Sequence, residues 1–157
     1  MRIISANPKN AVFFGFFIYA FGLGSLFTRL ADLQTQMDID KATLGLALAG
    51  LPAGVQATLL FADRLVRKIP FKILLGIGVP VIGLSQCLAS FVGTPVAFFF
   101  FLAFGGVSVA LIEVALNLEA DRVEAQTGQR IMNRSHAFWS FGFFAASIFG
   151  VSVAQLG

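Results

Sequence analysis

A single carboxylate lies inside an otherwise apolar part of this sequence. Glu113 follows a stretch, 73–112, that contains no Asp, Glu, Lys or Arg, and Asn117 comes one helical turn later. In a helix, residues four apart share a face, so the acid and the amide would lie together. An acid that gains and loses a proton at membrane depth is what coupling proton flow to solute movement requires. The pair therefore predicts a proton-coupling site; the alternative is a Glu held neutral by a hydrogen bond between helices.

Other polar groups are scarce. His136 precedes Trp139 and Ser140 near the start of the last apolar segment, where a histidine could act as a proton relay or gate. Anchoring at the membrane interface is the alternative reading. There is no second histidine, and Cys87 is the one cysteine, so no metal cluster, disulfide or other cofactor is expected. Without a nucleophile–base pair at membrane depth, we predict that the chain is not an enzyme.

The composition indicates a lipid environment. Of the 157 residues, 57% are hydrophobic, only 12% are charged, and 19 are Phe. A soluble domain of this length needs more charge to cover its surface. The net charge of +3 is spread over several loops, which excludes a nucleic-acid-binding footprint. The bilayer is therefore the expected surroundings of this protein.

Charged residues mark the boundaries of the apolar segments. A crossing needs about 20 apolar residues, and the uncharged stretch 73–112 is about twice too long for one. Gly93-Thr94-Pro95 near its middle supplies the turn between two crossings. We predict an all-α membrane protein whose 157 residues form a single domain of five transmembrane helices. Their expected bounds are about 10–29, 42–62, 72–92, 95–118 and 136–157.

The distribution of basic residues predicts the orientation. Lys and Arg gather in loops on the cytoplasmic side of membrane proteins. Nine of them fall on the side of the N-terminus and two, Arg29 and Lys41, on the other. The N-terminus is therefore expected in the cytoplasm and the C-terminus outside. The nine are Arg2, Lys9, Arg64, Arg67, Lys68, Lys72, Arg122, Arg130 and Arg134.

Small residues recur at helical spacing along three of the expected helices. Helices in lipid associate through close backbone approach, which small side chains allow. These rows predict close packing between helices, and Pro80 predicts a kink in the third helix. The rows are Gly50 and Gly54, Gly106 and Ala110, and Gly142, Ala146 and Gly150.

The loop after the second expected helix carries a known pattern. The segment 61–68 contains Asp63, Arg64, Arg67 and Lys68 in the order of the cytoplasmic signature of the major facilitator superfamily, which it resembles. Two glycines of that signature are replaced by other residues here. The resemblance implies that these charged groups latch the inner ends of helices and control opening.

Two further segments resemble one group within that superfamily. The segment 112–117 is similar to the acid-x-A-x-N pattern on the fourth helix of fucose-permease-like facilitators, and 130–142 looks like their loop into helix five. The resemblance implies proton-coupled symport of a small polar solute across a bacterial inner membrane, with Glu113 accepting the proton and Asn117 beside the solute. The carboxylate that the fucose permease carries on helix one is absent from 10–28, so sugar specificity is not implied.

The resemblance also bears on how much of a transporter this chain provides. Facilitators have two six-helix halves that hold the solute between them. Five helices would be an incomplete N-terminal half, which works with a missing C-terminal half or a partner subunit. The alternative is a small membrane protein that does not transport but acts through contacts between helices, with the row Gly142, Ala146 and Gly150 as its docking face.

Overall fold

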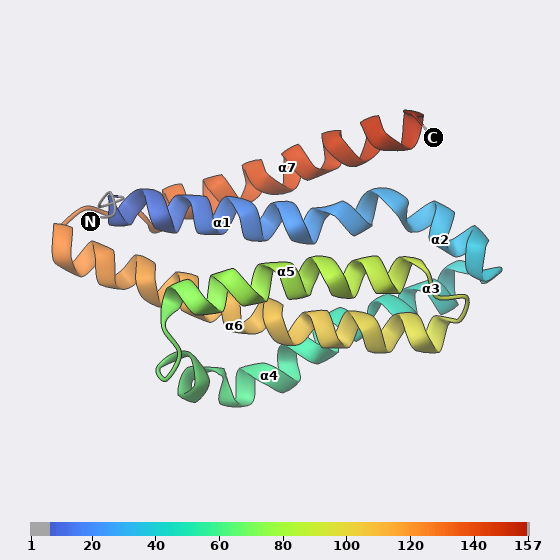
Figure 1. Ribbon diagram of the computed structural model, residues 1–157, viewed down its shortest axis with the longest axis horizontal. Coiled ribbons are helices and arrows are strands. Elements are labelled where there is room, and N and C mark those ends of the chain that lie inside the picture. The colour runs from blue at the N-terminus through green and yellow to red at the C-terminus, as the bar shows by residue number, and fades with distance from the viewer. Residues whose placement is uncertain (1–6, 157) are drawn as a thin grey trace.

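Long helices, packed side by side and running alternately in opposite directions, make up this protein (Figure 1). The computed structural model describes residues 7–156, and every regular element among them is helical. In chain order the elements are α1 (Pro8–Gly24), the 3-10 helix η1 (Ser25–Arg29), α2 (Leu30–Met37), α3 (Lys41–Leu48), α4 (Gly50–Val66), α5 (Phe71–Ser90), α6 (Pro95–Thr127) and α7 (Met132–Leu156).

Five of these helical stretches are long and apolar enough to cross a membrane. The first combines α1, η1 and α2, and the second combines α3 and α4; each of the other three is a single helix. The prediction of an all-α, multi-pass membrane protein with five spans is therefore confirmed. The spans are Pro8–Met37, Lys41–Val66, Phe71–Ser90, Pro95–Thr127 and Met132–Gln155.

The helices extend further than the charge pattern predicted. α6 has 33 residues, so at about 1.5 Å per residue it is about 50 Å long, against about 30 Å of hydrocarbon. It runs beyond the expected end near 118 because the polar segment 119–127 consists mainly of good helix formers. Gly128, with a φ of 64°, then ends the helix in the left-handed conformation that glycine tolerates best.

Side chains cap the starts of α6 and α7. The Thr94 hydroxyl accepts a hydrogen bond from the Ala97 amide at 3.3 Å and starts α6. Glu124, near the end of α6, accepts from the amides of Ile131 and Met132 at 2.5 and 2.7 Å. Those amides begin α7, which explains why the last span starts at Met132 and not at the expected residue 136.

The predicted small-residue rows lie at the closest helix crossings. A Cβ added at Gly50 or Gly54 would collide with backbone atoms of Phe99 or Ala103, so α4 and α6 touch through their backbones. On the other side of the molecule, a Cβ at Gly142 would meet the carbonyl oxygen of Phe17 in α1. Only glycine permits such an approach at these points.

The two crossings are built alike. In α4, Gly50, Leu51 and Gly54 approach α6, while in α7 Gly142, Phe143 and Ala146, with the same spacing, approach α1. Each partner helix also contributes one glycine to the contact. Gly106 of α6 lies against Leu51 and Gly54, and Gly24 of α1 lies against Phe143 and Ala146.

Because successive spans alternate in direction, the first span runs opposite to the fourth. The first two spans and the last two therefore run in inverted order, and they meet at these two similar crossings.

Candidate functional site

A cleft of about 400 Å³ opens between α1, α6 and α7 and contains the acid on which the sequence analysis focused. α1 contributes three residues, α6 contributes two that lie one turn apart, and α7 contributes two from its second turn. The full lining is Phe16, Tyr19, Leu23, Val109, Glu113, His136 and Trp139.

Glu113 is exposed to this cleft although it lies within a membrane-spanning helix. It is about 27 Å along α6 from Pro95, at about 1.5 Å per residue. The ion pairs formed among residues 7–156 join Arg29 to Asp32, Arg67 to Asp63 and Arg122 to Glu119, and none includes Glu113. Within the described chain, its carboxyl group can therefore take a proton or a bound solute without first breaking a salt bridge.

Asn117 does not line the cleft. Its side-chain nitrogen donates a hydrogen bond of 2.9 Å to the backbone carbonyl of Glu113, one turn earlier in the same helix. The Asn117 side chain is half-buried, and its hydrogen bond is made within its own helix. The structure thus places the two predicted residues on adjacent turns of α6, but only Glu113 faces the cleft.

His136 faces the same cleft from α7. It lies in the second turn of that helix, is exposed, and has its ring 5.2 Å from the ring of Phe16. The imidazole and the carboxyl group of Glu113 come from different helices and share one cavity. A histidine here can pass protons to or from the acid through water or a bound solute.

Two aromatic residues complete the cleft, and sequence reasoning did not assign either to the site. Tyr19 is the only tyrosine and Trp139 the only tryptophan of the chain. Tyr19 is almost fully buried, and the Trp139 ring stacks on Phe143 with centroids 5.7 Å apart. Their rarity in a sequence rich in Phe is the signal that could have pointed to them. Unlike Phe, each of the two adds a polar donor to an aromatic surface.

The charged segment at the end of α4 contains an ion pair between Asp63, in the last turn of the helix, and Arg67, which follows it. Arg67 donates from Nε to both carboxylate oxygens of Asp63, at 2.9 and 3.0 Å, one turn apart. Hydrogen bonding to Asp63, with Coulombic attraction, raises the pKa of Arg67 above its ordinary value. Arg64 and Lys68 are exposed. Within residues 7–156, no ion pair or hydrogen bond joins the one acid or the three bases of this motif to another helix.

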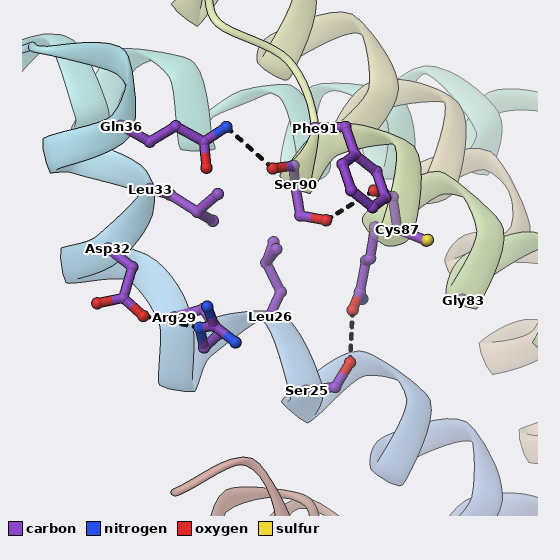
Figure 2. Close-up of a pocket in the computed structure, with 11 residues that line it drawn as sticks. Ser25, Leu26, Arg29, Asp32, Leu33, Gln36, Gly83, Cys87, Ser90 and Phe91 are labelled. Atoms are coloured by element: carbon purple, nitrogen blue, oxygen red, sulfur yellow. Dashed lines mark hydrogen bonds and ion pairs between the residues drawn. The ribbon is translucent and has the colours of Figure 1, made fainter. Parts of the chain in front are cut away.

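A second, larger cleft of about 540 Å³ lies further along the first span, between that span and α5 (Figure 2). There Ser25 donates to the Gln86 side-chain oxygen at 2.9 Å, and the Gln86 amide donates to the Leu23 carbonyl at 3.4 Å. These bonds lie where α1 gives way to the 3-10 helix η1, which leaves main-chain groups without α-helical partners. Gln86 therefore holds two helices together at a break in the first span.

This larger cleft offers less chemistry than the smaller one. Its only charged groups, Arg29 and Asp32, form an ion pair of 2.7 Å on one side of the opening (Figure 2). Apart from the thiol of Cys87, each titratable group in this cleft has an opposite charge beside it. The Glu113 cleft is thus the better candidate for a functional site.

Comparison with protein families, with curated proteins and with solved structures finds no match for this chain. Among the residues that the structure describes, no three His, Cys, Asp or Glu side chains gather closely enough to hold a metal ion.

Proposed function

We propose that this chain is part of a proton-coupled secondary transporter for a small polar solute, with Glu113 as the proton acceptor. One observation carries the proposal: Glu113 is an exposed carboxyl group within a membrane-spanning helix, in a cleft between three helices, with no cation paired to it in the described chain. Ionisable residues within membrane-spanning helices usually face a cavity or the bundle interior and mark functional sites.

The remaining lining suits a polar solute. Trp139 presents an aromatic surface with an N–H donor, the almost fully buried Tyr19 forms part of the wall, and His136 can donate or accept. A solute with hydroxyl or amide groups can hydrogen-bond to these groups and to Glu113 while its carbon skeleton covers the rings. Proton uptake on Glu113 and solute binding then occur in one cavity, as coupling requires.

The inverted order of the spans supports the same proposal. Secondary transporters are commonly built from inverted repeats, with the substrate site near the repeat interface. Here Glu113 on the fourth span and Tyr19 on the first line one cleft, and these two spans correspond in the inverted order. Together with the signature-like segment 61–68, this favours the N-terminal half of a major facilitator fold. The proposal includes a second set of helices opposite the cleft, from the same polypeptide or from a partner.

The proposed setting is a bacterial inner membrane, with the N-terminus in the cytoplasm. The excess of Lys and Arg in the loops on that side supports this orientation. The alternative of a small protein that docks other helices through the row Gly142, Ala146 and Gly150 is less favoured, because this row packs against α1 and η1 within the chain itself.

Proton uptake into vesicles tests the proposal. The protein, purified with any partner that copurifies from its native membrane, is reconstituted in liposomes loaded with a pH-sensitive dye. Neutral sugars, polyols and amino acids are then added one class at a time. We expect at least one class to drive proton entry, and Glu113→Gln to abolish this entry while solute exchange persists. The matched control is Asp121→Asn, an exposed acid of the same helix outside the cleft. Unchanged proton entry with Glu113→Gln would exclude the proposed role.

A further inference from the structure

A groove of about 290 Å³ runs along the surface where α4 ends, α5 begins and α6 passes beneath them. Most of its wall is apolar, and its polar groups are limited to three charged side chains on the two flanking helices. The lining is Val66, Arg67, Ile69, Pro70, Phe71, Leu74, Ala115, Leu118, Glu119 and Arg122. None of these residues is a proton acceptor or a solute contact in the proposed transporter.

Two guanidinium groups from different helices line this groove. Arg67, at the end of α4, binds Asp63 only through Nε, and its two terminal nitrogens make no hydrogen bond among residues 7–156. Arg122, on α6, lies 3.7 Å from Glu119, a distance beyond ordinary hydrogen bonding. Both side chains are largely exposed, at 69% and 68%. Each can therefore donate to a further acceptor placed between them.

The length of α6 sets the depth of these groups. Because α6 is longer than the hydrocarbon is thick, its last turns lie at the level of lipid headgroups. Arg122 belongs to those turns, whereas Ala115 and Leu118 lie one to two turns deeper. Arg67 comes directly after the apolar part of the second span, which ends at Val66. The groove thus has an apolar depth and a cationic rim at the membrane surface.

We propose that this groove binds one anionic phospholipid from the leaflet where α4 ends, with the phosphate between Arg67 and Arg122. Guanidinium groups match phosphate oxygens in a bidentate geometry. One acyl chain would lie along the apolar wall of Val66, Leu74 and Leu118. Exposed Arg64, Lys68 and Lys72 lie in or beside the same loop and add positive charge, which favours an anionic headgroup over a zwitterionic one.

The proposal is tested by lipid binding to the purified protein, independent of transport. Delipidated protein is titrated with phosphatidylglycerol or with phosphatidylcholine of the same acyl chains, and bound lipid is measured by native mass spectrometry. We expect a preference for phosphatidylglycerol that drops about fivefold for each guanidinium removed, and about 30-fold in the double variant Arg67→Gln, Arg122→Gln.

The matched control is Arg29→Gln. Arg29 is also an exposed arginine paired with an acid within one turn of the chain, but it lies at the opposite end of the spans. An equal affinity for the two lipids in the wild-type protein, or an equal loss with Arg29→Gln, would overturn the proposal. If the double variant does not fold by circular dichroism, the salt dependence of the wild type decides. Loss of the preference as NaCl rises supports the site, and a salt-independent preference contradicts it.

Discussion

Replacing Gly54 with alanine tests whether backbone contact between α4 and α6 holds the bundle together. The added methyl group would meet the carbonyl oxygen, carbonyl carbon and Cα of Ala103. All three are backbone atoms of a continuous helix, so no side-chain rotation can relieve the collision. The two helices must separate, and the neighbouring crossing at Gly50 and Phe99 separates with them.

The expected magnitude follows from two opposing effects. Alanine stabilises a helix relative to glycine by up to about 1 kcal/mol. Overpacking a tight contact costs about 1 to 3 kcal/mol, and the upper part of that range applies because backbone atoms are involved. We therefore expect Gly54→Ala to lower the free energy of unfolding by about 1 to 2 kcal/mol.

Gly76→Ala is the matched control, because Gly76 also lies within a membrane-spanning helix but has no atom within 4 Å of an added Cβ. This variant should be as stable as the wild type or more stable, by up to about 1 kcal/mol. Unfolding is followed by circular dichroism in mixed micelles of rising SDS content. Equal stability of the two variants would refute the conclusion that the α4–α6 crossing depends on glycine.

Three further predictions concern hydrogen bonds at helix ends and breaks. Gln86→Leu should destabilise the protein by about 1 to 3 kcal/mol, measured in the same SDS titration, because it removes the hydrogen bonds that the buried Gln86 makes with Ser25 and with the Leu23 carbonyl. Glu124→Ala should speed amide hydrogen exchange at the start of α7 and leave the other helices unchanged, since Glu124 caps that end. Hydrogen bonds from Thr43 lower the pKa of Asp40 below its usual 3.8, so its stabilising effect is present above that pH and is lost as the pH falls below it. Asp40→Asn, which can still cap the helix, should remove this acid sensitivity of α3 and keep the neutral-pH stability.

The number and type of the helices could be predicted from local sequence. A crossing must satisfy its own main-chain hydrogen bonds and keep charge out of the hydrocarbon, so each span is visible in the chain as a long uncharged segment. Local sequence also showed the turn at Gly93, Thr94 and Pro95 and the glycine rows on α4 and α7, because both are read from residue types at fixed spacing. Helix ends were less predictable, because a polar helix such as the last turns of α6 continues past the charges that mark the membrane boundary.

The partners of each polar group depended on the tertiary structure. Glu113 could be recognised as unusual from its own neighbours, but Tyr19 and His136 reach the same cleft from other helices far along the chain. Asn117 has the right spacing to accompany Glu113, yet it bonds to its own main chain. Hydropathy is a property of a segment and is set by the sequence alone, whereas a cleft depends on how helices cross. Those crossings arise from contacts between distant glycines and backbone atoms, which only the folded chain brings together.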